Sequence, residues 1–507
     1  MQLDRETCRK ARLARDARFD GRFFIGVRTT KIFCRPICPA ISPREGNVDY
    51  YPSAASAAAA GLRPCLRCRP ECAPGTPAWN GSSSTVSRAL REIAAGALDA
   101  AGVGDLADRL GVGERHLRRL FLEHLGAPPV AVAQTHRLLS AKRLLDETDL
   151  PVSTVALAAG YGSVRRFNHV FRETWNRSPR QLRETRRDGR RGARGKGLCF
   201  RLRYRPPFDW DALLGFLSTR SIPGVEHVED GIYRRSIRVA GVAGMIELSH
   251  SAPKVAAPEV ILEIDHARPE CLLGIVSRVR RLCDLDADPV AIASGLSSDA
   301  VLRPLVDARP GLRVPGAWDG FELGIRAILG QQISVGGAST LAGRLVERYG
   351  RPFESARRGV THLFPRAEDL AGADLASIGL PRKRAETLSA FSAAVASGQL
   401  VLDGSAAPEE TRERLRSIAG IGDWTAGYVC MRALNDPDAF PTADLVLLRA
   451  AGAGTARELQ GFAERWRPWR AYAALHLWQG VNDGNLRHPN LLRLDGKPGW
   501  KAAAGGG

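Results

Sequence analysis

The chain has 507 residues, of which 44% are hydrophobic, and a formal net charge of +19. This length predicts several domains, and ten cysteines in so long a chain exclude a small disulfide-dense scaffold. The cations are spread along the chain and favour a polyanionic partner, nucleic acid first, with a merely basic protein of Arg-rich composition as the alternative.

The N-terminal sequence MQLDRETCRK has neither an apolar core nor a small-residue cleavage site. No apolar run approaches the length that crosses a membrane. We therefore expect a cytoplasmic protein with no membrane partner.

Four cysteines near the N-terminus form two short pairs, Cys34-x-x-x-Cys38 and Cys65-x-x-Cys68, separated by an Ala-rich stretch that favours a helix. In a reducing compartment this spacing favours one tetrahedral Zn²⁺ over disulfides. Cys8 and Cys72 are left over as free thiols.

The phrases VRTTKIFCRPICP and GLRPCLRCRPE around these cysteines resemble the N-terminal domain of the Ada family. The resemblance implies a small α+β domain over residues 1–78, with Zn²⁺ held by Cys34, Cys38, Cys65 and Cys68. It also implies that Cys34 accepts a methyl group from a DNA methylphosphotriester. Methylation would reduce the negative formal charge of the site from −2 to −1, so we expect it to tighten DNA binding.

Two helix-turn-helix patterns follow within residues 79–187, GDLADRLGVGERHLRRLFLEHLG and PVSTVALAAGYGSVRRFNHVFRETW. An ordinary helical bundle is the alternative. The second pattern, ending in Ser178-Pro179, resembles the AraC-type regulators, with Asn176 where that family prefers Gly. The resemblance implies an all-α domain that binds promoter DNA and works with RNA polymerase. Its groove-facing residues would be Arg115, Arg118, Arg119, Arg165, Arg166 and His169.

Residues 188–197 are rich in Gly and Arg and are predicted to be a basic linker. Strand and helix patterns alternate in residues 198–310, which predicts an α+β layer arrangement. The run YRPPFDWDALLGFLSTRSIPGVEHV resembles the N-terminal domain of AlkA, a 3-methyladenine DNA glycosylase. The Pro-Cys-His-Arg motif of alkylguanine transferases is absent from the sequence, so we expect no such activity.

Residues 311–495 contain a helical segment from Thr411 to Ile418, a turn at Gly420-Ile421-Gly422, a second helical segment from Trp424 to about Leu434, and then Asp444. Glycines in such a turn let backbone N–H groups converge on a DNA phosphate. The bland alternatives are a plain turn and an Asp that caps a helix.

This pattern resembles the helix-hairpin-helix DNA glycosylases, an all-α fold, and implies that Asp444 is the catalytic carboxylate. Trp424 stands where strand-cleaving relatives have a nucleophilic lysine, so the single-function branch is implied. In relatives a leucine wedge occupies the position of Gln332. The AlkA Asp pair is reduced here to Ala443-Asp444. By position, the base pocket would comprise Trp424, Tyr428 and Trp478, and the DNA contacts Gly420, Gly422, Thr425, Gln331 and Gln332.

The leading hypothesis is a monomeric alkylation-damage protein that joins a methyl-accepting sensor, a transcription activator and an alkylpurine glycosylase that acts on double-stranded DNA. The rival hypothesis is a regulator whose C-terminal half binds DNA without catalysis. Residues 496–507 are expected to be a flexible tail.

Overall fold

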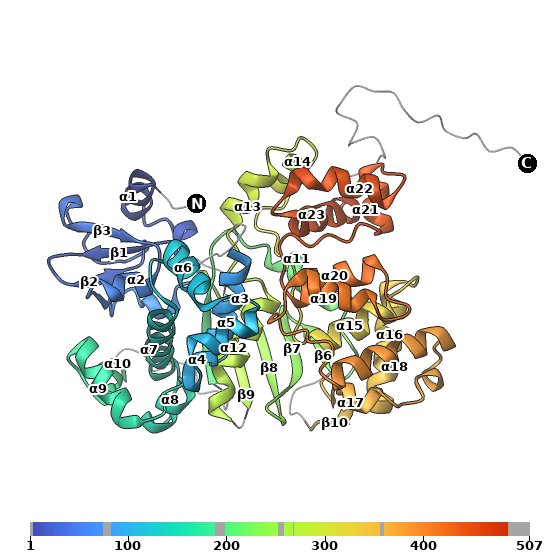
Figure 1. Ribbon diagram of the computed structural model, residues 1–507, viewed down its shortest axis with the longest axis horizontal. Coiled ribbons are helices and arrows are strands. Elements are labelled where there is room, and N and C mark those ends of the chain that lie inside the picture. Colours follow the sequence, from blue (N-terminus) through green and yellow to red (C-terminus); the bar gives the residue numbers. More distant parts are fainter. Residues whose placement is uncertain are drawn as a thin grey trace, which may run out of the picture.

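The structure is a computed structural model that describes residues 4–74, 83–187, 198–251, 258–266, 268–354 and 359–484. The expected linker at 188–197 and the expected tail at 496–507 lie outside these residues. Within them, no helix is both long and apolar enough to cross a membrane. Figure 1 shows the folded parts side by side, with the N-terminal modules on the left and the C-terminal helices on the right.

The zinc module, residues 4–74, is a four-stranded sheet of order β3-β1-β2-β4 with helices packed beside it, which confirms the expected small α+β domain. The Ala-rich stretch forms α2, and a reciprocal Ser53–Ser56 capping box starts that helix. The module comprises α1 (Arg5–Leu13), β1 (Phe24–Val27), β2 (Ile32–Cys34), β3 (Val48–Tyr51), α2 (Ala54–Ala59), β4 (Arg63–Pro64) and the 3₁₀ helix η3 (Pro70–Cys72).

The helical module, residues 83–187, contains both expected helix-turn-helix units. Gly111 ends the first helix of the first unit with a φ of 69°, a conformation that glycine adopts without strain. Asn176 ends α9 with a φ of 54°, so it takes the left-handed conformation predicted for it. The helices are α3 (Ser83–Ala94), α4 (Ala97–Ala100), α5 (Val103–Leu110), α6 (Glu114–Leu125), α7 (Pro129–Glu147), α8 (Val152–Ala158), α9 (Val164–Trp175) and α10 (Pro179–Arg187).

The sheet module, residues 198–308, is built on a five-stranded antiparallel sheet of order β5-β9-β8-β7-β6. The short strand β6 was not expected from the sequence. The module comprises β5 (Leu198–Arg203), α11 (Trp210–Thr219), β6 (Glu226–Glu229), β7 (Ile232–Val239), β8 (Val242–Ser251), β9 (Glu259–His266), α12 (Leu272–Leu282), α13 (Pro289–Leu296) and α14 (Leu302–Ala308).

The hairpin module, residues 320–484, is helical apart from one pair of two-residue strands, β10 (Arg351–Pro352) and β11 (His362–Leu363). The two helices of the glycine hairpin begin earlier than the sequence suggested, at Pro408 and Asp423. The helices are α15 (Gly320–Leu329), α16 (Val335–Tyr349), α17 (Ala367–Leu370), α18 (Arg382–Ala396), α19 (Pro408–Arg416), α20 (Asp423–Ala433), α21 (Leu445–Ala451), α22 (Ala456–Ala463) and α23 (Arg470–Asn482).

The modules pack directly against one another. Apolar residues of the second helix-turn-helix unit and of the five-stranded sheet belong to a single buried cluster, with Phe171 and Leu262 among its fully buried members. Arg205, also fully buried, donates from Nε to the backbone oxygen of Asp20 at 2.8 Å and so ties the sheet module to the zinc module. The helical module and the sheet module therefore share a core.

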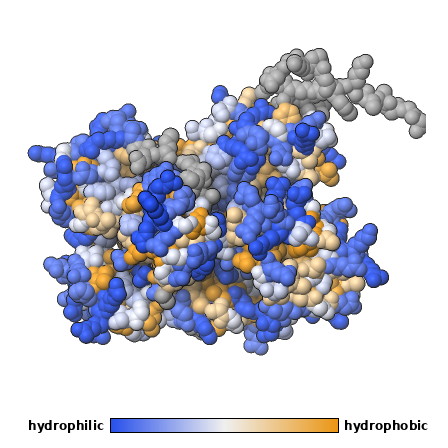
Figure 2. Space-filling model, in the orientation of Figure 1, coloured by the Kyte–Doolittle hydropathy of each residue, from blue (hydrophilic) through white to orange (hydrophobic). Residues whose placement is uncertain are grey.

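Much of the face in Figure 2 is hydrophilic, including the regions over α6 and over α19 and α20. The second helix of the first helix-turn-helix unit and the glycine hairpin thus both lie on this face of the molecule.

Candidate active sites

Asp444 is the residue around which the larger site is built. It caps the N-terminus of α21, and its Oδ1 accepts from the backbone N–H groups of Val446 and Leu447 at 3.0 and 2.9 Å. The capping role and the predicted active-site role are therefore held by one side chain.

Two indole N–H groups also donate to this carboxylate. Trp424 Nε1 lies 2.8 Å from Asp444 Oδ2, and Trp478 Nε1 lies 3.0 Å from Asp444 Oδ1. A carboxylate offers about four lone-pair sites. Because three donors converge on Oδ1, Oδ2 is the oxygen with acceptor capacity left.

A cavity of about 840 Å³ opens beside Asp444, within the size range of small-molecule sites. Trp424 and Tyr428 stack with ring centroids 5.3 Å apart and planes 9° apart, and Trp478 meets Tyr428 edge-on at 6.4 Å. The structure thus brings together the three aromatic residues predicted for the base pocket. No lysine lies among the described residues that line the cavity.

Several residues that line this cavity were not predicted from the sequence, notably Phe216, Arg220 and Arg432. Arg432 follows Tyr428 by one helical turn, and this spacing could have indicated it. Burial raises the pKa of Tyr428, but the positive charges of Arg432 and Arg220 outweigh burial and lower it overall.

The glycine hairpin lies between α19 and α20. Gly420 has a φ of 89°, and a Cβ there would come within 2.1 Å of Thr387 Oγ1, so this position requires glycine. A Cβ on Gly422 would meet no described atom within 4 Å, which leaves its backbone open to approach. Gly422 precedes α20 without a side-chain cap. Both features suit the predicted phosphate contact.

Three further residues predicted to contact DNA lie close to the hairpin. Thr425 is 2% exposed, so a DNA contact there would fall to its backbone N–H. Gln331 Nε2 donates to the Gly420 oxygen and to Thr425 Oγ1, both at 3.0 Å, and so braces the hairpin from inside. Gln332 is exposed, with a φ of 56°.

The four predicted zinc ligands are gathered in one place. The Sγ atoms of Cys34, Cys38, Cys65 and Cys68 all lie within 4.8 Å of one another. Four thiolates on one Zn²⁺ at about 2.3 Å would be about 3.8 Å apart, so this soft donor set fits the metal. Cys65 and Cys68 are buried, whereas Cys34 and Cys38 are partly exposed.

The residue after Cys34 holds this cluster in place. The backbone N–H of Arg35 donates to Cys68 Sγ at 3.3 Å, and its Nη1 donates to the Cys68 oxygen at 2.9 Å. The Arg35 side chain is fully buried and pairs with Asp20. Contacts with Cys38 and then Cys65 raise the pKa of Cys34. A bound cation would lower that pKa and favour the Cys34 thiolate.

The predicted groove-facing cations lie on the second helix of each helix-turn-helix unit, and all of them are exposed: Arg115, Arg118, Arg119, Arg165, Arg166 and His169. Two of these have acidic neighbours on the same helix. Arg118 pairs with Glu114 at 2.6 Å, and His169 Nε2 lies 3.3 Å from Glu173. Their contacts with DNA remain predictions.

Comparison with known families divides the chain into four matched segments. These are the metal binding domain of Ada at residues 7–71, a helix-turn-helix domain at 106–185, the AlkA N-terminal domain at 199–319, and the HhH-GPD superfamily base excision DNA repair protein at 325–455. The exact domain boundaries given above remain predictions.

Individual relatives match either nearly the whole chain or one part of it. The probable bifunctional transcriptional activator/DNA repair enzyme AlkA of Mycobacterium tuberculosis is 41% identical, over 96% of this chain and 98% of that protein. DNA-3-methyladenine glycosylase 2 of Escherichia coli is 34% identical, over 55% of this chain and 96% of that protein. Ada of Escherichia coli is 36% identical, over 34% of this chain and 47% of that protein.

Among solved structures, a 3-methyladenine DNA-glycosylase from Archaeoglobus fulgidus aligns with 56% of this chain and 98% of its own, with a TM-score of 0.50 and 24% identity. This likeness supports the fold of the C-terminal half. The whole-length relative and the four matched segments show that the chain belongs to the family of bifunctional transcriptional activator/DNA repair enzymes that join an Ada metal-binding domain and helix-turn-helix units to an AlkA-type glycosylase.

Proposed function

We propose that the C-terminal half hydrolyses the N-glycosidic bond of alkylated purines, such as 3-methyladenine, in duplex DNA. The observation that carries this proposal is the Asp444 carboxylate, held between the indole N–H groups of Trp424 and Trp478 at an aromatic cavity. An enzyme cannot reach the glycosidic bond of a base that is stacked inside the DNA duplex. The base must therefore be flipped out, and a cavity of this kind can receive it.

In this proposal the flipped base stacks on the aromatic rings while C1′ of its sugar faces Asp444. As the C1′–N bond breaks, positive charge develops on the sugar, and Oδ2 of Asp444 stabilises it. Water then attacks C1′ and loses its proton, and the products are a free base and an abasic site. No lysine lines the described cavity, so we propose that the strand stays intact.

We propose that the zinc module takes up one methyl group per molecule. Cys34 Sγ attacks the methyl carbon of a phosphotriester, an S–C bond forms, and the C–O bond to the phosphotriester oxygen breaks to leave an ordinary phosphodiester. Zn²⁺ bound by the four cysteines supplies the positive charge that keeps the sulfurs deprotonated. The partial exposure of Cys34 supports its role as acceptor over the buried Cys65 and Cys68.

The exposed cations of α6 and α9 support a further proposal that the helical module binds promoter DNA. We also propose that it works with RNA polymerase and that the protein is a monomer. The rival function, regulation without base excision, draws support from Gln332, which lacks the apolar surface of a wedge.

Incubating the whole protein with methylated duplex DNA tests the enzymatic proposal against its rival. We expect chromatography to detect free 3-methyladenine, and gel analysis to detect abasic sites without strand breaks. Binding without base release would favour the rival. A nicked strand, or an adduct trapped by borohydride, would contradict the single-function chemistry.

A further inference from the structure

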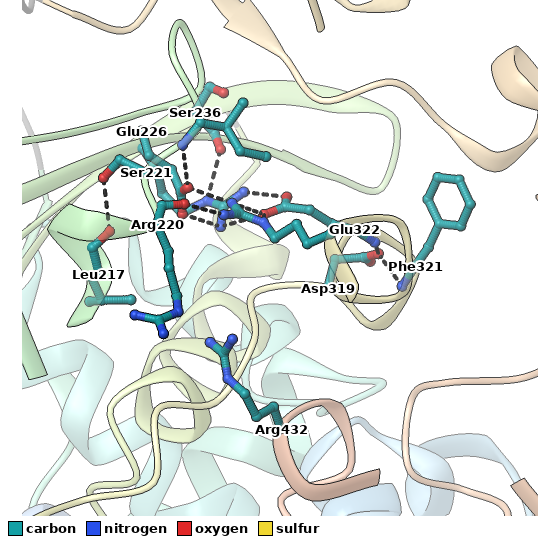
Figure 3. A network of polar contacts seen from close by, with 12 residues as sticks. Leu217, Arg220, Ser221, Glu226, Ser236, Asp319, Phe321, Glu322 and Arg432 are labelled. Atoms are coloured by element: carbon teal, nitrogen blue, oxygen red, sulfur yellow. Dashed lines mark hydrogen bonds and ion pairs between the residues drawn. The ribbon is translucent and has the colours of Figure 1, made fainter. Parts of the chain in front are cut away.

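Two arginines, Arg220 and Arg432, line the base cavity. Arg220 ends α11, and Arg432 lies in the last turn of α20. Both guanidinium groups lie over the ring of Phe216, with Cζ atoms 3.9 and 4.7 Å from its centroid. Figure 3 shows the two side chains approaching one another beneath a larger polar network. This part of the cavity therefore carries two adjacent positive charges.

The carboxylates of this region are already used by other partners. Glu322 pairs with Arg235 and with Arg326, each at 2.6 Å, and Glu226 pairs with Arg326 and accepts from the hydroxyl of Tyr233. Glu226 and Glu322 both lie in the network of Figure 3. Among the described residues, neither Arg220 nor Arg432 makes an ion pair with a carboxylate.

The two arginines differ in how firmly they are held. Arg432 donates to the backbone oxygens of Pro315 and Gly316 at 2.7 and 2.9 Å, and to the Tyr428 hydroxyl at 2.7 Å. Arg220 donates to Thr219 Oγ1 at 3.1 Å and faces the Tyr428 hydroxyl. A guanidinium has five N–H donors, so Arg220 keeps donors for a molecule in the cavity.

Helix α20 sets the direction in which a base would lie. Trp424, Tyr428 and Arg432 succeed one another by four residues, and are therefore about 6 Å apart along the helix axis. Trp424 contacts Asp444, where the sugar would lie, and Arg432 lies at the opposite end. In a purine, the substituent on C6 is on the side of the rings away from the glycosidic nitrogen. A flipped purine would thus turn its C6 edge toward the arginines.

We propose that Arg220, positioned beside Arg432, reads the C6 edge of the flipped base and favours 6-oxopurine lesions over 6-aminopurine lesions. A carbonyl oxygen at C6 accepts from the guanidinium, whereas an amino group there meets further donors and is left unpaired. This inference rests on the proposed glycosylase function. It makes Arg220 a specificity-determining residue.

The matched pair of substrates is 3-methylguanine and 3-methyladenine, both formed in the same methylated duplex. Both bases carry a formal positive charge and the same methyl position, so repulsion by the two arginines affects them alike. Guanine also differs from adenine by an amino group on C2. The effect of this group on the release rate is the same for every variant, so it cancels when the ratio of the two release rates is compared between variants. The change in that ratio therefore reports the contact at C6.

The test measures release of both bases by the whole protein and by Arg220→Met, which removes the donors but keeps an unbranched side chain. We expect the ratio of 3-methylguanine to 3-methyladenine release to fall by about tenfold in Arg220→Met. Arg220→Lys keeps the positive charge but replaces the planar guanidinium with a compact ammonium group. Its release ratio should therefore lie between those of the wild type and Arg220→Met. The control is Arg366→Met, an exposed arginine of the hairpin module that pairs with Asp369 outside the cavity, and it should keep the wild-type ratio.

An unchanged ratio in Arg220→Met, or an equal loss of both bases, would overturn the assignment while leaving the glycosylase proposal intact. Release of neither base by the unmodified protein would instead overturn the glycosylase proposal. Thermal unfolding of each variant separates loss of fold from loss of base reading, because a folded Arg220→Met with an unchanged ratio counts directly against the inference.

Discussion

The zinc site takes its four ligands from two short segments, Cys34 to Cys38 and Cys65 to Cys68, whereas the base cavity draws on residues as far apart as Phe216 and Trp478. In the first site, the ligands touch mainly one another. In the second, Asp444 is fixed both by the helix that it caps and by two aromatic donors. The four cysteines, which are close in the sequence, can position a metal ion and a reactive thiolate. The cavity is lined by residues from distant segments, so its shape and charge can also select among substrates.

Removing the reagent of the zinc site gives the largest expected effect. We predict that Cys34→Ala takes up no methyl group from methylated DNA, because the transferred carbon must bond to that sulfur. The remaining three thiolates should bind zinc more weakly. Mass spectrometry of the unmodified protein after reaction should place the methyl on Cys34, and this measurement does not depend on the folding of a variant.

The control for this prediction is Cys199→Ala, which removes an exposed cysteine outside the zinc cluster and should keep methyl uptake. Affinity for promoter DNA should rise after methylation, and the gain should shrink at high salt because it comes from a lower negative charge. A methyl group found on Cys38, Cys65 or Cys68 would refute the assignment, and a gain independent of salt would refute the electrostatic switch.

Asp444→Asn is the corresponding change in the cavity, and we predict that base release falls by at least about a hundredfold. Asn can still cap α21, but its amide group then faces an indole N–H donor, which should also lower the free energy of unfolding by about 1 kcal/mol. Single-turnover release and chemical unfolding measure the two effects.

Asp369→Asn is the matched control, since Asp369 also caps a helix, α17, but lies outside the cavity. It should keep base release while losing a comparable amount of stability. Binding of Asp444→Asn to duplex DNA should persist, because the hairpin is untouched. Substantial turnover by Asp444→Asn would remove this carboxylate from the mechanism.

The two sites also differ in how far the sequence predicts them. Spacing alone predicted the cysteine cluster, because its ligands are near neighbours in the chain and metal geometry restricts the choice. The role of Asp444 was implied by the resemblance to the helix-hairpin-helix glycosylases, because local turn and cap preferences alone predict only a helix cap. The pocket roles of Trp424 and Tyr428 came from the same resemblance.

Contacts between segments that are distant in the chain could not be predicted from the sequence. Phe216 and Arg220 come from α11, and no local pattern indicates that they meet α20. The shared core of the second helix-turn-helix unit and the five-stranded sheet was likewise missed, since apolar residues of separate domains look alike in sequence. Gln331 was predicted to contact DNA, and the sequence did not indicate that its side chain also donates to the Gly420 oxygen.

The role of the aromatic donors can be tested with a smaller change. Trp478→Phe keeps an aromatic ring for stacking but removes the N–H that donates to Asp444 Oδ1 at 3.0 Å. We predict that base release falls by about tenfold, the effect of one hydrogen bond to a charged group. The control is Trp175→Phe, in the helical module. It should leave the release rate within about twofold of wild type, and an equal loss in both variants would indicate a general effect on folding.

The smallest expected effect concerns Gln332, because this residue acts on base flipping rather than on bond cleavage. It is exposed, has a φ of 56°, and lies in the chain between Gly330 and Ile333, which line the cavity. Leucine and glutamine both carry a Cβ, so Gln332→Leu adds little backbone strain, and its apolar side chain should fill the space of an extruded base better. We expect release from duplex DNA to rise a few-fold, and release from single-stranded DNA, where no stack must be opened, to stay the same. The ratio of the two rates isolates flipping from chemistry, and an equal change on both substrates would show that Gln332 does not act as the wedge.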